Sequence, residues 1–408
     1  MKTWQSSVLS GVVLAVSAIF GTTIEPALAE NAPGVTATEI KIGQNMPYSG
    51  PVSAYGILGR GHLGFIKWVN DTMGGVNGRK INLISLDDGY NPAKAVENIR
   101  KMVEEEKVAF IFGSIGTATN TAVQKYLNDN QVPQLFIASG ADKWGDYKRF
   151  PWTMSWQATF RTEAQIYVKY VLRANPNAKF AILFQDDDYG KDYINGMKDI
   201  LGADYGKRVT EASYEVTDPT VDSQVVSLQA SGADTLIVAA TPKFAAQSIR
   251  KVYDIGWKPM FFMSNVSIAA KTTMEPAGPE KAIGMISSAY SRDPGDPAWT
   301  GDPAVTKFHD IMVKYFPGEN PYDFNFENSY GMVMTLVQVL KQCGEDLSRD
   351  NIMRQAANIH DLVVDSELPG IKLNTSPTDY HPIKQMQLQK WDGKSWVRFG
   401  ELISGGNL

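Results

Sequence analysis

Short apolar runs alternate with longer amphipathic stretches from residue 40 to about residue 265, and this alternation limits the fold more than any other feature. The apolar runs predict buried strands, and the amphipathic stretches predict helices. Strands that alternate with helices form parallel sheets with helices on both faces, so we expect a doubly wound α/β fold. The expected strands are 40–44, 81–86, 109–112, 134–137, 180–184, 235–239 and 260–263, and the expected helices are 58–70, 93–105, 119–130, 162–174, 189–201, 223–230 and 243–255.

Two interruptions of this alternation predict a division into two lobes. Residues 150–156 carry no helix signal, and residues 290–303 are rich in Pro, Gly and Asp. We interpret the first as a crossing between lobes, because a single sheet with this many strands would be large. Helices are expected again at 304–315, 328–342 and 351–358, and the alternating segments 384–391 and 395–399 predict a hairpin around Asp392-Gly393-Lys394.

The N-terminus has the pattern of a cleaved export signal. Lys2 precedes an apolar segment, residues 8–20, which is too short to span a bilayer as a helix. Ala27-Leu28-Ala29 then offers the small residues that a signal peptidase recognises, so we expect residues 1–29 to be removed. A retained membrane anchor is the alternative. No later apolar run reaches the roughly 20 residues that a membrane-spanning helix needs.

Charge and composition argue against several classes of function. The chain has 39 basic and 44 acidic residues, whereas a nucleic acid or an anionic lipid as partner calls for a basic patch. Cys343 is the only cysteine, so an internal disulfide is impossible. There is no Gly-x-Ser-x-Gly sequence, and none of the four histidines is beside a candidate nucleophile, which argues against an enzyme.

Neither a metal nor a cofactor is expected. Three consecutive aspartates, residues 186–188, follow the expected strand 180–184. Successive residues of one short turn cannot all point at one ion, and no histidine is nearby. The turn at residues 113–119 contains no Gly-Lys-Ser or Gly-Lys-Thr P-loop, so a nucleotide is not implied there.

Hydroxyl side chains follow two neighbouring strands. Ser114 and Thr117 lie between the expected strand 109–112 and the next helix, and Ser139 and Gly140 follow the strand 134–137. Free N–H groups and the helix dipole favour an anion at such a turn, and doubly wound sheets bind ligands at the carboxyl ends of their strands. A carboxylate site is one interpretation of the first turn, and an ordinary helix N-cap is the other.

Four short motifs occur in a recognisable order: residues 50–56 (GPVSAYG), 77–81 (NGRKI), 87–88 (DD) and 91–92 (NP). In this order they resemble the opening of the leucine/isoleucine/valine-binding family, the solute-binding proteins of ABC importers. The resemblance implies two lobes joined by three crossings, with the third near 366–372. Lobe one would then comprise 38–153 and 291–368, and lobe two 154–290 and 369–408.

The resemblance also implies a function. A periplasmic monomer would capture a small carboxylate ligand, close over it and deliver it to an ABC permease in the inner membrane, with no chemistry of its own. A periplasmic sensor that docks on a separate receptor is the alternative. Both require the same ligand site between the lobes.

The residues that match the family's ligand site come from both lobes. Thr117 matches a hydroxyl that clamps the ligand's carboxylate, and Gly140 matches a backbone contact. Tyr189 matches a tyrosine whose ring covers the ligand, and Tyr55 matches a tyrosine at the rim of the cleft. We expect Ser114 and Ser139 to assist on the first lobe, and Thr241 to close over the ligand from the second.

Asp142 and Asn265 depart from the family pattern. In the family, the position of Asp142 is usually occupied by threonine. Asn265 is at the position of a glutamate that pairs with the ammonium group of an amino acid. Either the ligand lacks an ammonium group, or Asp142 or another acid replaces the glutamate. Aromatic residues near the expected crossings, such as Trp144 and Phe160, would suit an aromatic or short-chain acid. A cysteine pair that family members often carry is replaced here by Tyr90 and Gly116.

Overall fold

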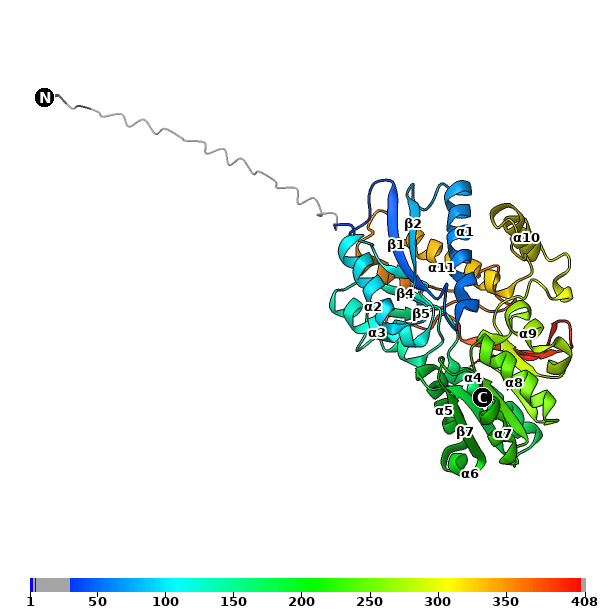
Figure 1. The fold of residues 1–408 in the computed structure, drawn as a ribbon. Helices are drawn as coiled ribbons and strands as arrows, with labels where there is room; N and C mark the ends of the chain where they lie inside the picture. Colours follow the sequence, from blue (N-terminus) through cyan, green and yellow to red (C-terminus); the bar gives the residue numbers. More distant parts are fainter. Residues whose placement is uncertain (3, 5–29, 405–408) are drawn as a thin grey trace.

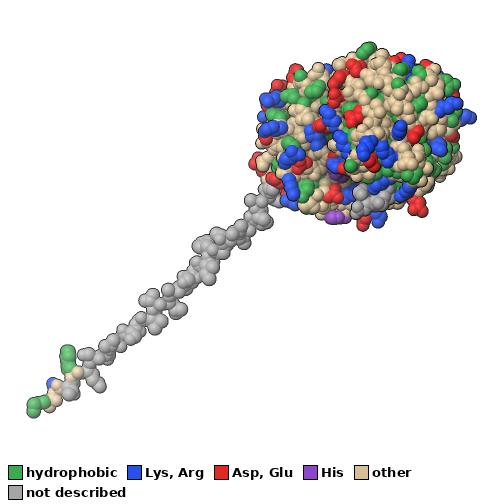
Figure 2. Space-filling model, turned by 90° about the horizontal axis from the view of Figure 1, so that it is seen from below, with side chains coloured by type: hydrophobic (Ala, Val, Ile, Leu, Met, Phe, Trp, Pro, Cys, Tyr) green, Lys and Arg blue, Asp and Glu red, His purple; other side chains and the backbone are tan. Residues whose placement is uncertain are grey.

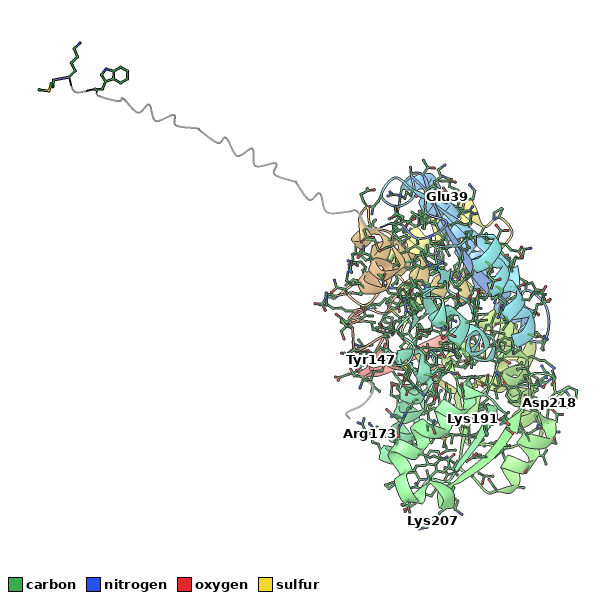
Figure 3. All side chains as sticks on the ribbon, turned by 90° about the vertical axis from the view of Figure 1, so that its left-hand side faces the viewer. Glu39, Tyr147, Arg173, Lys191, Lys207 and Asp218 are labelled. Atoms are coloured by element: carbon green, nitrogen blue, oxygen red, sulfur yellow. The ribbon has the colours of Figure 1, made fainter. Side chains whose placement is uncertain are left out.

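The computed structural model describes residues 1, 2, 4 and 30–404, so the expected signal peptide, residues 1–29, lies almost entirely outside the described residues. Residues 30–404 form two α/β lobes, one above the other in Figure 1. In the side view of Figure 3, Glu39 and Lys207 mark the far ends of the two lobes. The two-lobed α/β fold expected from the sequence is confirmed.

The first lobe is built on a five-stranded sheet with the order β2-β1-β3-β4-β5, in which all neighbouring strands are parallel. Its strands are β1 (Glu39–Met46), β2 (Lys80–Asp87), β3 (Ile111–Phe112), β4 (Gln134–Ile137) and β5 (Thr153–Ser155). Its helices are α1 (Gly56–Thr72), α2 (Pro92–Arg100), α3 (Thr117–Asp129), α10 (Pro303–Tyr315), α11 (Phe324–Cys343) and α12 (Arg349–Ala356).

The second lobe is built on a seven-stranded sheet with the order β12-β11-β10-β9-β8-β6-β7. The strands from β7 to β10 are parallel, and the hairpin β11–β12 adds two antiparallel strands. The strands are β6 (Phe180–Gln185), β7 (Val209–Tyr214), β8 (Thr235–Ala239), β9 (Met260–Met263), β10 (Ile286–Ala289), β11 (Gln385–Trp391) and β12 (Trp396–Ser404). The helices are α4 (Phe160–Ala174), α5 (Asp188–Leu201), α6 (Tyr205–Arg208), α7 (Asp222–Ala230), α8 (Pro242–Asp254) and α9 (Glu275–Ala277).

Every strand and helix expected from the alternation is present, but three strands were missed. β7 is an edge strand, and only its last residue is fully buried, so its sequence shows no apolar run. β10 contains Ser287 and Ser288, which are fully buried although they are polar. β5 has three residues and lies within the interruption at 150–156. In all three cases, pairing with a neighbouring strand of the sheet forms a strand that the local sequence pattern indicates only weakly.

Two crossings lie a few residues away from the expected positions. β5 pairs with β4, so the first sheet continues to Ser155, past the expected boundary at 153. Leu373 pairs with Leu362, and the Thr375 hydroxyl donates to the Ala356 carbonyl at 2.7 Å. The chain therefore stays with the first lobe beyond the interval 366–372 before it enters β11. The middle crossing follows β10.

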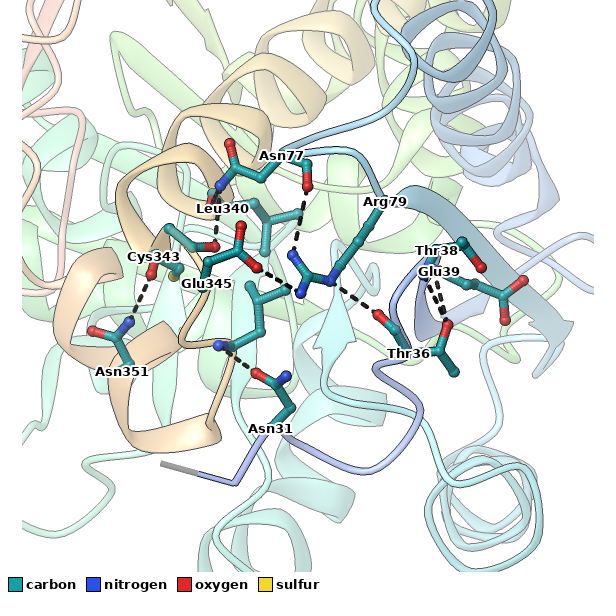
Figure 4. A network of polar contacts seen from close by, with 12 residues as sticks. Asn31, Thr36, Thr38, Glu39, Asn77, Arg79, Leu340, Cys343, Glu345 and Asn351 are labelled. Carbon is teal, nitrogen blue, oxygen red and sulfur yellow. Dashed lines mark hydrogen bonds and ion pairs between the residues drawn. The ribbon is translucent and has the colours of Figure 1, made fainter. Parts of the chain in front are cut away.

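The motif 77–81 lies at the far end of the first lobe, where it ties the N-terminal segment to the end of α11 (Figure 4). Asn77 has a left-handed φ of 48°, and its amide donates to the Leu340 carbonyl at 3.2 Å. Arg79 donates through Nε to the Thr36 carbonyl at 2.9 Å and pairs through Nη2 with Glu345 at 2.8 Å. This motif therefore serves the fold and not the region between the lobes.

Basic and acidic side chains are interspersed over the face of the molecule shown in Figure 2. Some form exposed ion pairs, such as Lys125 with Asp129 at 2.6 Å, and a pair of this kind contributes only about 0–1 kcal/mol to stability. Within the described residues, no helix combines the length and the apolar character needed to cross a membrane.

Candidate functional site

A pocket lies between the two lobes. Both lobes and two of the crossings contribute to its lining. The first lobe contributes Tyr55, Leu58, Tyr90, Ile115, Gly116, Thr117, Ala138, Ser139, Phe324, Asn325 and Asn328. The second lobe contributes Phe160, Tyr189, Thr241, Asn265 and Val266, and the crossings contribute Gln157 and Tyr290.

Six of the nine site residues expected from the sequence line this pocket. They follow the carboxyl ends of β1, β3, β4, β6, β8 and β9, where parallel strands of both sheets end at the cleft. Their contact with a ligand stays a prediction. The six are Tyr55, Thr117, Ser139, Tyr189, Thr241 and Asn265.

Thr117 and Ser139 form the polar floor of the pocket on the first lobe. Their hydroxyl oxygens are 2.7 Å apart, and the Trp144 indole N–H donates to the Ser139 hydroxyl at 3.1 Å. Thr117 is the first residue of α3, and Gly116 before it offers no side-chain cap. The first N–H groups of α3 are thus left for a ligand, as an anion site requires.

Ser114, Gly140 and Asp142 do not line the pocket. The Ser114 hydroxyl accepts from the backbone N–H of Asn45 at 2.9 Å inside the first lobe. Gly140 allows close approach of the first crossing, because a Cβ there would lie 2.4 Å from the Ala158 carbonyl oxygen. Asp142 faces away from the pocket, and its carboxylate is 3.4 Å from Arg161. The structure therefore does not bring Asp142 to the place of the missing glutamate.

Tyr90 fills the space that Gly116 leaves. A Cβ on Gly116 would lie 2.4 Å from the Tyr90 ring, and the Gly116 φ of 101° is itself unfavourable for other residues. The Tyr90 hydroxyl accepts from the Gln185 amide of the second lobe at 3.3 Å. Tyr90 therefore lines the pocket and also contacts the opposite lobe, a role that the sequence analysis did not assign to it.

Contacts across the cleft show that the lobes are closed. The Tyr55 hydroxyl donates to the Val266 carbonyl at 2.8 Å, and burial raises its pKa above the usual value. Beside the pocket, Lys143 of the first lobe pairs with Asp188 of α5 at 2.9 Å. Asp188 is one of the three consecutive aspartates, whose contacts diverge: Asp187 caps α5, and Asp186 pairs with Lys191 at 3.2 Å.

A fully buried carboxylate, Glu163, supports the second lobe's side of the pocket. It accepts from the Asn265 backbone N–H at 3.0 Å and from the Ser288 hydroxyl at 2.6 Å, and also from the hydroxyls of Tyr167 and Tyr193. Burial raises the pKa of Glu163, and these four donors act in the opposite direction. Glu163 thus fixes the turn that presents Asn265. The sequence did not indicate this role, because nothing in a helical pattern marks Glu163 as buried.

The aromatic residues divide between pocket and core. Phe160 and Phe324 line the pocket, and the Phe160 ring lies 4.5 Å from that of Tyr189. Trp144 and Trp156 are fully buried outside the pocket lining. The aromatic surface offered to a ligand is therefore mainly that of the two phenylalanines and of tyrosines from both lobes.

None of the described residues that line the pocket is Asp, Glu, Lys, Arg or His. Nor do the described residues contain a group of three or more His, Cys, Asp or Glu that could hold a metal. The polar lining consists of hydroxyl and amide groups beside helix N-termini. Such a lining can bind one anionic group through N–H and O–H donors and can hold an apolar body, but it offers no partner of opposite charge to an ammonium group.

Two α/β lobes that close on a pocket at the carboxyl ends of their strands define a two-lobed ligand-binding protein. The family model described as "Periplasmic binding protein" matches residues 39–395, and the chain belongs to this family of binding proteins. Its relatives are of the leucine/isoleucine/valine-binding type, as the sequence motifs indicated.

Relatives of this type match along most of the chain. The Leu/Ile/Val-binding protein homolog 7 of Brucella abortus (strain 2308) is 22% identical over 369 residues, which cover 88% of this chain and 90% of the relative. A branched chain amino acid ABC transporter from Thermus thermophilus with bound valine matches with a TM-score of 0.80 and 14% identity, covering 91% of this chain and 98% of its own. A fatty acid ABC transporter substrate-binding protein from Thermomonospora curvata matches with a TM-score of 0.76 and 20% identity, covering 92% and 95%.

Proposed function

We propose that this protein captures a small carboxylic acid that has no ammonium group and delivers it to an ABC permease. The observation that supports this most directly is the absence of charged side chains among the described residues that line the pocket. An ammonium group that leaves water without a carboxylate partner loses a large hydration energy. A carboxylate, in contrast, finds donors at Thr117, Ser139 and the first turn of α3.

The similar proteins are consistent with such a ligand. The Thermus thermophilus structure contains valine, which has an ammonium group, whereas the name of the Thermomonospora curvata protein specifies fatty acid, which has none. A single fold therefore accommodates both kinds of acid. We infer that this chain binds an acid without an ammonium group, because Asn265 replaces the family's glutamate.

Closure of the lobes would couple binding to delivery. The ligand docks first on Thr117 and Ser139, and Tyr189, Thr241 and Asn265 then cover it from the second lobe. Binding shifts the population towards the closed form, which the permease recognises. The family is named for the periplasm, and an export signal in residues 1–29 would deliver the chain there.

A thermal-shift screen of refolded, ligand-free protein tests this proposal. The panel contains leucine, valine, phenylalanine and their matched acids without the amino group. A ligand at 100 times its Kd stabilises the folded state by about 2.7 kcal/mol, which is readily seen as a higher melting temperature. We expect only the acids without the amino group to stabilise the protein. Stabilisation by leucine or valine alone would contradict the proposal and point to an ammonium partner that is not apparent in the closed pocket.

Ligand affinity is expected to rise as the pH falls from 8 to 6. In the closed form, burial raises the pKa of Asp192 to about 7, and the backbone N–H of Asp142 from the other lobe contacts its carboxylate at 2.7 Å. When the lobes separate, the carboxyl regains water and its pKa returns towards 3.8. At a pH between 3.8 and about 7, closure of the lobes is accompanied by the uptake of a proton on Asp192. The contribution of Asp192 to closure is therefore present at low pH and is lost above pH 7.

Calorimetric titrations at pH 6 and pH 8 with the tightest acid of the panel measure this effect, which we expect to be about two- to tenfold in Kd. Asp192→Asn keeps the acceptor for the Asp142 N–H but cannot titrate, so its affinity should not vary with pH. Asp204→Asn, an exposed control, should behave as the wild type. An unchanged pH dependence in Asp192→Asn would assign the effect to another group.

A further inference from the structure

Two residues of the crossings, Gln157 and Tyr290, line the pocket in addition to the groups that receive the carboxylate. Gln157 follows β5 in the first crossing, and Tyr290 follows β10 in the second. Their exposed fractions are only 7% and 3%. Polar side chains from two different crossings therefore line the same pocket.

The Gln157 side chain has an unused acceptor in this part of the pocket. Its Oε1 atom is buried and has no hydrogen-bond partner among the described residues. Asn328 of α11, which also lines the pocket, contributes Oδ1, whose one hydrogen bond among the described residues comes from the Ser291 hydroxyl at the long distance of 3.5 Å. Buried polar atoms are nearly always hydrogen-bonded, so an unpartnered one needs an explanation.

The fold does not require the Gln157 amide. The first crossing is positioned by its backbone and its neighbours: the Phe160 N–H donates to the Gly140 carbonyl at 2.8 Å, and the Trp156 indole donates to the Thr335 hydroxyl at 3.0 Å. An apolar side chain of the same size at position 157 would avoid the cost of a buried, unpartnered acceptor. A polar side chain there is explained if the ligand supplies the missing partner.

We propose that Gln157, Tyr290 and Asn328 form a second polar subsite that binds a hydroxyl group of the ligand. The ligand is then a hydroxylated carboxylic acid, and this inference rests on the function proposed above. A hydroxyl can donate to Gln157 Oε1 and accept from the Tyr290 hydroxyl at the same time. An ammonium group fits less well, because a neutral amide does not offset the loss of hydration of a full charge.

A subsite of this kind determines specificity. A pocket built to hydrogen-bond a hydroxyl rejects the analogue that lacks it, because the buried polar groups of the protein are then left unpaired. We therefore expect the hydroxylated member of a matched pair of acids to bind about 10- to 100-fold more tightly than the parent acid.

Calorimetry on refolded protein with matched acids tests the proposal. The aromatic series is phenylacetate, mandelate, with a hydroxyl beside the carboxylate, and 4-hydroxyphenylacetate, with a hydroxyl at the far end. The aliphatic pair is 4-methylpentanoate and its 2-hydroxy derivative. Each acid is titrated into the wild type, Gln157→Leu and Gln124→Leu. Gln124 is the matched control, because it is buried, has an unpartnered amide nitrogen among the described residues and does not line the pocket.

In support of the proposal, one hydroxylated acid should bind the wild type at least tenfold more tightly than its parent. Gln157→Leu should reduce this ratio to less than threefold and leave the affinity for the parent acid within threefold, whereas Gln124→Leu should preserve the ratio. The ligand-free Gln157→Leu protein should melt at the same temperature as the wild type or higher, because the variant loses a buried, unpartnered polar atom.

The outcomes separate this inference from the proposed function. If parent and hydroxylated acids bind the wild type equally and Gln157→Leu changes neither, the subsite is refuted while a carboxylate-binding protein remains. If Gln157→Leu lowers the melting temperature and weakens all acids alike, Gln157 is structural and the subsite is also refuted. If no acid binds the wild type and an amino acid does, both the proposed function and the subsite fail.

Discussion

Replacing Thr117 by valine is expected to weaken the binding of every carboxylate ligand by about 10- to 100-fold without unfolding the protein. Valine keeps the shape of threonine but removes the hydroxyl that lies 2.7 Å from the Ser139 hydroxyl on the pocket floor. A hydrogen bond to a charged group contributes about 1.5–3 kcal/mol, and each 1.4 kcal/mol corresponds to a factor of ten in Kd. Calorimetric titration with the tightest acid of the thermal-shift panel measures the loss.

Thr119→Val is the matched control, because Thr119 lies on the same helix, is buried and does not line the pocket. Its hydroxyl donates to the Ile115 carbonyl at 3.0 Å, so its loss should affect stability slightly and affinity by less than threefold. Equal affinities of Thr117→Val and wild type would rule out the anion site at the start of α3. Equal losses in both variants would show that α3 as a whole, and not the Thr117 hydroxyl, controls binding.

Replacing Glu163 by alanine is expected to lower the free energy of unfolding by roughly 3–6 kcal/mol. The substitution leaves four donors without their acceptor in a fully buried site, namely the hydroxyls of Tyr167, Tyr193 and Ser288 and the Asn265 N–H. An unsatisfied buried donor costs about 1–3 kcal/mol, and some of these donors retain a second partner. Urea denaturation followed by tryptophan fluorescence measures the change.

Glu163→Gln should cost much less, about 1–2 kcal/mol, because one oxygen remains and the Tyr193 hydroxyl can turn to the Ser264 hydroxyl at 2.7 Å. Glu97→Ala, an exposed residue of α2, should change stability by less than about 0.5 kcal/mol. A stability of Glu163→Ala within 1 kcal/mol of the wild type would mean that water replaces the carboxylate. A loss of ligand affinity in Glu163→Gln greater than its loss of stability would show that Glu163 also positions Asn265 for binding.

Sequence patterns predicted the parts of the fold that arise from local periodicity. The apolar runs at 180–184 and 235–239 became buried central strands, because a strand covered on both faces needs continuous apolar residues. The strand β10 was not predicted, because Ser287 and Ser288 are polar and interrupt the apolar pattern. Their burial depends on hydrogen bonds that form only in the folded protein, such as the one from the Ser288 hydroxyl to Glu163. The division into two lobes followed from a break in the alternation, although β5 lies inside that break.

The ligand site was also predicted in part from the sequence. Thr117, Ser139 and Tyr189 follow the ends of predicted strands, and the rules for parallel sheets place such residues at the cleft. Asp142 follows the same rule in sequence, yet its carboxylate faces Arg161 outside the pocket. The direction of a side chain after a turn depends on the backbone of the neighbouring crossing, which sequence position alone does not specify.

The sequence by itself determined the order of strands and helices, the class of fold and the turns that end at the cleft, because these depend on residues close together along the chain. Only the tertiary structure decided that Gln157, Tyr290 and Asn328 line one pocket, since they come from two crossings and a helix, and Gln157 lies more than a hundred residues before the other two. It also decided that Glu163 is buried among four donors, because burial depends on which elements pack around a residue and not on its own identity.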